Sequence, residues 1–177
     1  MERTELHCRH IDIRGFRRSD GLFEVEGRII DTKPYDLDIP FGRKVAAHSP
    51  LHNLGVRLVY DMDLLVHDVT TFTDAAPYDV CPGGGIALKA VIGLRMVAGW
   101  NMAVRNRINK SHNCTHLVEL LGPLATVAFQ TISGLRTPQD TLDKDGRPLK
   151  IGSCYAYAAD GEMVKKRWPH FYEEKKP

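Results

Sequence analysis

The amino-acid sequence predicts an α+β fold, in which an antiparallel sheet of about five strands has two long helices packed on it. Alternating apolar and polar residues come first in the chain, and two long apolar patterns with helical spacing follow them. Another short alternating stretch comes after the helices. Strands and helices grouped in this order are typical of helices on an antiparallel sheet, whereas parallel sheets alternate strand and helix.

Four strands are expected before the helices. Residues 6–16 and 22–33 predict a hairpin, because an Asp-Gly pair between them is a strong turn signal. The second of these strands has an apolar face and a charged face, so we expect one face of the sheet to meet solvent. Residues 56–60 and 64–73 predict a second antiparallel hairpin.

The two helices are expected at residues 86–109 and 115–135. The second helix continues its apolar pattern past Pro123, so we expect one helix with a kink there. Glu119 is the only formally charged side chain in residues 111–135. A surface helix shows a broad charged face, and we therefore expect this helix to be buried.

Length and composition favour one domain over residues 1–177, with a last strand at residues 150–158 and a charged tail from about Glu162. The hydrophobic share of 43% and the charged share of 26% are ordinary for a globular protein. A net charge of +2 is too small to indicate binding to nucleic acid. We expect no membrane-spanning segment and no signal peptide, hence a cytoplasmic protein, with homo-oligomer formation left open.

His116 and Glu119 are the first candidates for a functional site. They lie one turn apart on the second helix, so their side chains share a face, and Gln130 extends the same polar line. A histidine–carboxylate pair can transfer protons or supply two ligands of a divalent metal ion. The alternative is a buried hydrogen-bond network that only fixes helix packing. We favour the functional interpretation, because burying an unpaired carboxylate is costly.

Other side chains are expected to complete this site. His52, just before the third strand, would add a third polar group to His116 and Glu119. If a metal ion is bound, His52, His116 and Glu119 would be its ligands, and His67 is the second choice for the ligand outside the helix. Asp74 is a further candidate acid or base, or only a turn residue.

Arg57, Arg18 and Gln130 are the candidate substrate-binding residues, with Arg57 as the clamp for a carboxylate or phenolate. The glycine triplet at 83–85 resembles an anion-binding turn, and residues 80–118 contain five Lys or Arg residues and no Asp or Glu. A solvated basic helix face explains the same pattern equally well.

The four cysteines form no Cys-x-x-Cys pair, which argues against a disulfide framework and a structural zinc site. Cys81 and Cys114 precede helix starts, where a thiol can be acidified. We favour buried reduced thiols for the cysteines.

A series of short motifs resembles a known family. The motifs of this series are Gly15-Phe16-x-Arg18-x-Asp20-Gly21-Leu22, Asp31-x-Lys33, His52, Asp74-x-x-Pro77-x-x-x-Cys81, Cys114-Thr115-His116-Leu117-x-Glu119 and Ala128-Phe129-Gln130. The series resembles a bacterial domain family of unknown function, number 2889 among such families, from about Arg9 to Tyr155. Asn113 departs from the glycine expected before the Cys-Thr-His-Leu block. The resemblance implies no established activity, but it associates the chain with bacterial breakdown of aromatic compounds, including cofactor-free or metal-assisted carbon–carbon lyases.

Together these observations predict a small cytoplasmic enzyme acting on a small aromatic or anionic compound, with lyase chemistry favoured over hydrolysis. Acid–base groups would drive it, with either no cofactor or one divalent metal ion. The first alternative is a non-catalytic ligand-binding or scaffold domain. A phosphate- or coenzyme-A-binding role is the second, and it depends only on the glycine turn and the basic residues.

Overall fold

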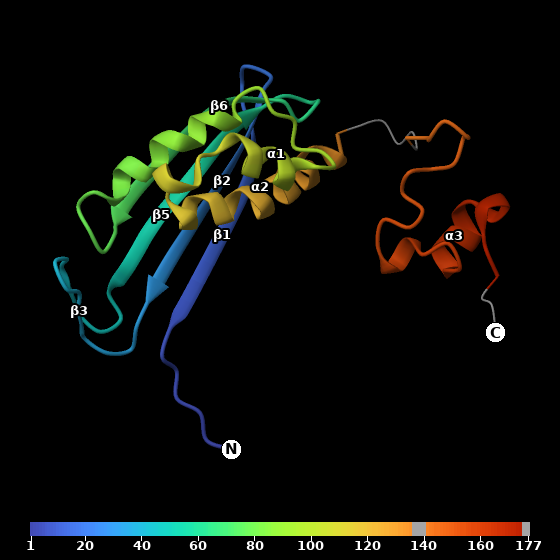
Figure 1. Cartoon of the computed structure of the whole chain (residues 1–177). Coiled ribbons are helices and arrows are strands. Elements are labelled where there is room, and N and C mark those ends of the chain that lie inside the picture. Colours follow the sequence, from blue (N-terminus) through green and yellow to red (C-terminus); the bar gives the residue numbers. More distant parts are fainter. Residues whose placement is uncertain (136–140, 175–177) are drawn as a thin grey trace. The chain divides into compact units, whose positions relative to one another are not determined.

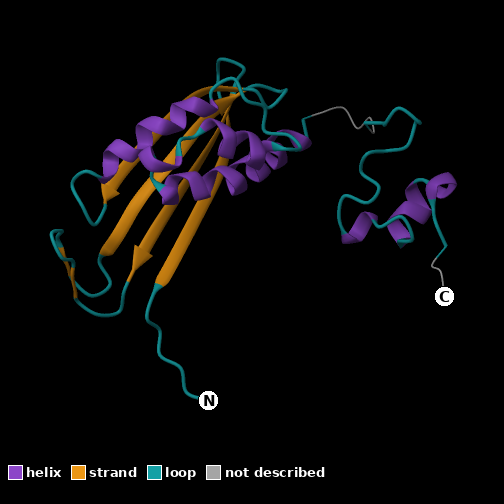
Figure 2. Ribbon diagram, in the orientation of Figure 1, coloured by secondary structure: helices purple, strands orange, loops and turns teal. Residues whose placement is uncertain are grey.

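The computed structural model describes residues 1–135 and 141–174, and contacts within the chain divide it into two units, residues 1–134 and 135–177. The first unit is a four-stranded antiparallel sheet with helices on one face (Figure 1; Figure 2). The strand order is β1-β2-β5-β6, and a small hairpin lies in the connection between β2 and β5. The strands are β1 (Cys8–Arg17), β2 (Phe23–Thr32), β3 (Leu37–Asp38), β4 (Lys44–Val45), β5 (Pro50–Tyr60) and β6 (Val66–Ala75).

The sheet has one apolar and one charged face, as the alternating pattern predicts. In β2, Val25 and Ile29 are fully buried, whereas Glu24 and Glu26 between the inward positions are only half-buried. Asp31 continues the inward series at the end of this strand and is also buried. The apolar face therefore ends in a carboxylate.

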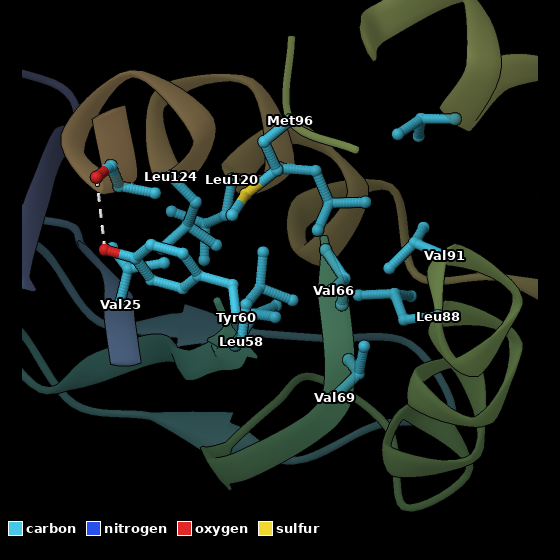
Figure 3. Close-up of a cluster of buried hydrophobic side chains, with 14 of the residues drawn as sticks. Val25, Leu58, Tyr60, Val66, Val69, Leu88, Val91, Met96, Leu120 and Leu124 are labelled. Atoms are coloured by element: carbon cyan, nitrogen blue, oxygen red, sulfur yellow. Dashed lines mark hydrogen bonds between the residues drawn. The ribbon is translucent and has the colours of Figure 1, made fainter. Parts of the chain in front are cut away.

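The long helix α2 (Thr115–Ser133) packs across β1, β2 and β5 and continues through Pro123. Its buried residues interlock with the sheet and with the segments before the helix, as Figure 3 shows for Leu120 and Leu124. The Tyr60 hydroxyl donates to the Ala128 carbonyl at 3.1 Å (Figure 3), and the Trp100 indole N–H donates to the Leu121 carbonyl at 2.8 Å. These two bonds tie the polar atoms of large core aromatics to the helix backbone.

Helix α2 is buried along one side only, so the expectation of a fully buried helix is wrong. Glu119, Thr126, Phe129 and Gln130 are exposed, and they form the open side of the helix. The sheet covers one side of α2, with α1 and η1 beside it, and cover on one side can bury only part of a helix surface.

The first predicted helix is divided. Residues 81–91 form the 3-10 helix η1 (Cys81–Val91), and the short helix α1 (Trp100–Arg107) follows it. Gly93 and Gly99 separate them with φ angles of 81° and 88°, a left-handed conformation that ends a right-handed helix.

The prediction of a fifth strand at residues 150–158 is wrong. This segment lies in the second unit and forms turns followed by the 3-10 helix η3 (Tyr155–Tyr157). The sheet therefore has four strands, although the α+β class and the antiparallel arrangement are confirmed.

The second unit also contains α3 (Glu162–Arg167) and the 3-10 helix η4 (Pro169–Phe171). Val164 is buried within it, and the rings of Tyr157 and Trp168 lie 5.9 Å apart. The expectation of one domain over 1–177 stays a prediction. Within the described part of the chain, the structure has no helix with both the length and the apolar character that a membrane crossing requires.

Candidate active site

A pocket of about 740 Å³ opens in the first unit between β5, η1 and the start of α2. Most of its wall is apolar, with contributions from Leu54, Pro77, Tyr78, Val80, Ile86 and Ala87. His52 and His116 line it as well, and none of the described residues that line it is Asp, Glu, Lys or Arg. A ligand in this pocket would therefore meet an apolar wall and a few polar groups.

Two neighbouring strands place His52 beside Asp31. The two residues face each other in the register between β5 and β2, immediately before an irregularity in the pairing. Both occupy positions that alternate in step with the buried residues of their strands, so both side chains point to the face of the sheet that carries the helices. His52 Nδ1 lies 3.0 Å from Asp31 Oδ2 in a hydrogen bond.

Arg9 holds the Asp31 carboxylate in place. Arg9 Nε donates to Oδ1 at 2.8 Å and Nη2 donates to Oδ2 at 2.9 Å, a bidentate pair across the β1–β2 register. His7 Nε2 lies 3.3 Å from Oδ1. Burial by itself raises the pKa of Asp31, but the hydrogen bonds and charge of Arg9 outweigh it, so this pKa lies below its ordinary value. Asp31 is therefore an ionised carboxylate although it is only 1% exposed.

His116 approaches His52 from the first turn of α2. The two ring centroids are 4.1 Å apart, with 39° between the ring planes. Cys114 Sγ lies 3.9 Å from His116 Nδ1, so the thiol contacts the same imidazole. One donor atom each from Asp31, His52 and His116 lie within 4.8 Å of one another.

His52 is held in its neutral form. Burial lowers its pKa first, and the neighbouring His116 lowers it further, while Asp31 acts in the opposite direction without reversing the shift. Near neutral pH this imidazole is therefore uncharged, with one ring nitrogen as a donor and the other as an acceptor. The contact with the anionic Asp31 assigns the proton to Nδ1.

Glu119 lies outside the pocket lining, and the expectation that it is buried is wrong. Its side chain is 52% exposed, and Oε2 accepts a hydrogen bond from Arg9 Nη1 at 2.7 Å. The position three residues after His116 shares the helix face only approximately, and here it points toward β1 rather than toward His52. Glu119 thus reaches the histidines only through Arg9 and Asp31.

Three predicted residues lie away from the pocket: Arg57 and Asp74 are on the solvent face of the sheet, and Arg18 is in the turn between β1 and β2. Arg57 pairs with Glu26 at 2.6 Å and with Glu24 at 3.3 Å. Arg18 pairs with Asp20 at 2.7 Å beside them.

Asp74 is the third of these residues, and it pairs with Arg28. The β2 partners of these residues, Glu24, Glu26 and Arg28, alternate with the buried positions of that strand, so they point to the face opposite the pocket.

Gln130 and His67 are also separate from the pocket. Gln130 follows His116 by 14 residues on α2. That separation corresponds to about 21 Å along the helix axis. His67 pairs with Asp61 at 2.9 Å near the β5–β6 turn.

The cysteines are less buried than expected. All four are free; Cys81 and Cys114 are half-buried and line the pocket, and Cys8 and Cys154 are exposed. The glycine triplet allows close packing beside them. A Cβ on Gly84 would lie 2.8 Å from the Cys114 amide nitrogen, and one on Gly85 would lie 2.2 Å from Thr71 Oγ1.

The sequence interpretation missed Asp31 and Arg9 as site residues. A signal for Asp31 was present, because it continues the inward series Phe23, Val25, Gly27 and Ile29. No comparable signal existed for Arg9, which stands among other charged residues on an edge strand.

Comparison with known proteins identifies a family and no activity. A protein-family model described as "Protein of unknown function (DUF2889)" matches residues 7–130. This range holds Arg9, Asp31, His52 and His116, and it confirms the resemblance carried by the Cys-Thr-His-Leu block. Neither the curated proteins nor the solved structures contain a match to the chain.

Proposed function

The chain belongs to the DUF2889 family, and we propose that it is an enzyme that cleaves a small aromatic compound in the pocket by acid–base chemistry. Lyase chemistry is proposed ahead of hydrolysis. The observation that carries the proposal is the meeting of Asp31, His52 and His116 at the edge of a mostly apolar pocket. Titratable groups gathered at such a pocket are typical of active sites.

The pocket lining favours an aromatic substrate over an anionic one. Leu54, Tyr78 and Ile86 offer apolar surface against which a ring can pack. No described Lys or Arg side chain lines the pocket, and Arg57, the expected clamp, lies on the other face of the sheet. A substrate carboxylate would have to leave water there without a Lys or Arg partner among the described lining residues, which is unfavourable.

The hydrogen bond to Asp31 makes His52 the proposed base. With its proton on Nδ1, the neutral ring keeps Nε2 as a proton acceptor. In a lyase reaction the imidazole takes the proton of a substrate hydroxyl, the oxygen lone pair becomes part of a carbonyl bond, and the adjacent carbon–carbon bond breaks. The carbon fragment that leaves with the electron pair then takes up a proton. Asp31 stabilises the imidazolium formed in the first step, and Arg9 fixes the orientation of Asp31.

Two probe substrates test the proposal. Cleavage of 4-hydroxy-4-(4-hydroxyphenyl)butan-2-one releases 4-hydroxybenzaldehyde and acetone, and the aldehyde is followed by its absorbance; 4-nitrophenyl acetate tests hydrolysis. We expect turnover of the first probe, and we expect His52→Gln to lower kcat/KM by roughly 100-fold or more. His116→Gln should lower it as well, while both variants keep a melting temperature near that of the unchanged protein.

His67→Gln is the matched control, because His67 also pairs with an aspartate but lies outside the pocket. It should leave kcat/KM unchanged. Absence of turnover of both probes, or loss of stability without a specific loss of activity, would instead favour the ligand-binding or scaffold alternative. A cytoplasmic location, and a small molecule rather than nucleic acid as partner, stay predictions of the same proposal.

A further inference from the structure

The carboxylate and the two imidazoles at the edge of the pocket have a chemical capacity beyond proton transfer. Asp31, His52 and His116 come from three different elements, yet one donor atom of each falls within 4.8 Å of the other two. We infer that these three residues bind one divalent transition-metal ion. The inference concerns the same residues as the proposed function, but it does not depend on the reaction class.

The spacing of the first two donors suits direct ligation. His52 Nδ1 and Asp31 Oδ2 are 3.0 Å apart. Two ligands at right angles around an ion, each at about 2.1 Å, are themselves about 3.0 Å apart. An ion that lies to one side of the line between these two atoms can replace the shared proton, and the ring proton then resides on Nε2. His52 can therefore act as the proposed base only in the metal-free protein.

His116 supplies the third ligand. Its ring lies 4.1 Å from that of His52, and it is half-buried at the pocket wall. One of its ring nitrogens lies within 4.8 Å of the donor atoms of Asp31 and His52, and the same residue lines the pocket from which a further ligand could approach. Two imidazoles and one carboxylate with open positions are a ligand set typical of iron(II) and zinc in catalytic sites.

The surrounding charges are compatible with a cation. Arg9 uses one lone pair on each Asp31 oxygen, and each carboxylate oxygen has two, so Oδ2 remains able to bind a metal. The positive charge of Arg9 is opposed by Glu119 as well as by Asp31. His7 Nε2 lies 3.3 Å from Oδ1, and Cys114 Sγ lies 3.9 Å from His116 Nδ1.

The test is metal binding by the full chain. Tag-free protein is treated with a chelator, dialysed and titrated with Co²⁺ and, separately, with Zn²⁺ by calorimetry. We expect one equivalent of each ion to bind, with Co²⁺ giving ligand-field absorption in the visible region. His116→Gln and Asp31→Asn should each weaken binding at least tenfold, and His116→Gln serves if Asp31→Asn does not fold.

Two matched controls separate this site from the alternatives. His67→Gln changes a histidine that pairs with an aspartate at 2.9 Å without a second imidazole beside it, and binding should be unchanged. Glu119→Gln removes the carboxylate that the sequence pattern favours as a ligand, and it too should leave binding unchanged. Absence of stoichiometric binding, equal binding by His116→Gln, or loss of binding in Glu119→Gln would each overturn the inference.

The same preparations distinguish the two proposals. If no ion binds and the protein still turns over the aryl hydroxyketone whereas His52→Gln does not, the metal site is overturned and the proposed function stands. If one ion binds and no probe is turned over, the metal site stands and the proposed reaction fails.

Discussion

Asp31 is the one charged side chain that is fully buried in the described part of the chain. It keeps its charge because Arg9 binds both carboxylate oxygens and His52 donates to one of them. A buried charge without such partners would be strongly destabilising. The same arrangement fixes the tautomer and orientation of His52, so stability and chemistry depend on one carboxylate.

Replacement of Asp31 by Asn tests this dependence. In metal-free protein at neutral pH we expect Asp31→Asn to lower the free energy of unfolding by about 3 kcal/mol, because Arg9 loses its buried counter-charge. Arg57→Gln is the control: it breaks ion pairs on the exposed face and should change the free energy by less than about 1 kcal/mol. Urea unfolding measures both values, and equal losses in the two variants would contradict the assignment.

The pH dependence of this loss has a defined sign. Because the folded-state pKa of Asp31 is lowered, its stabilising contribution is fully present above the unfolded-state pKa of about 3.9. It is lost as the pH falls through the lower folded-state value. The difference between Asp31→Asn and the unchanged protein should therefore shrink in acid, for as long as the protein remains folded.

At the scale of elements, the candidate site lies where β2 ends and where β5 and α2 begin. Asp31 is the next-to-last residue of β2, His52 is the third residue of β5, and His116 lies in the first turn of α2. The packing of η1 against that turn sets where α2 begins, since the Cys114 amide donates to the Gly84 carbonyl at 3.1 Å. Close backbone approach at Gly84 therefore helps to position His116.

Two adjacent glycines test this packing. Gly84→Ala places a methyl group 2.8 Å from the backbone nitrogen of Cys114, which cannot move aside without shifting the helix. We expect a loss of about 1–3 kcal/mol in the free energy of unfolding. Gly83→Ala has open space and should be neutral or stabilising by up to about 1 kcal/mol. Urea unfolding of the two variants would contradict the packing role if Gly83→Ala were the more damaging change.

At the scale of the molecule, the first unit contains both the pocket and the main core. The connected cluster of buried apolar side chains runs from Phe23 to Ile132, and every residue that lines the pocket lies in the same unit. The family match over residues 7–130 covers nearly the same range.

A shortened chain tests whether this unit is self-sufficient. We expect residues 1–134 to fold alone, with a free energy of unfolding within about 1 kcal/mol of the full chain and with a near-ultraviolet circular-dichroism signal from Trp100, the one tryptophan in that part of the sequence. A shortened chain that is unfolded, or that loses the Trp100 signal, would show that the single domain expected over 1–177 is the better description.

Local patterns were sufficient for much of the fold. The strand alternation, the Asp-Gly turn and the long apolar helix at 115–135 are properties of neighbouring residues, and the structure contains α2 and four of the five strands predicted from them. The errors came where a local pattern has more than one outcome. Apolar spacing continues through Gly93 and Gly99, but their left-handed conformations divide that helix. The alternation at 150–158 lacked a neighbouring strand with which to pair.

By itself, the sequence determined the α+β class and the family, and it singled out His52 and His116 as candidate site residues, because these depend on composition, periodicity and a local motif. Only the tertiary structure decided which carboxylate joins them. Asp31 is distant from both histidines in the chain, and strand register and helix placement bring it to His52, while Glu119, one turn from His116, points to Arg9 instead. Sequence spacing fixes neighbours within one element, whereas contacts between elements depend on how the whole chain buries its apolar surface.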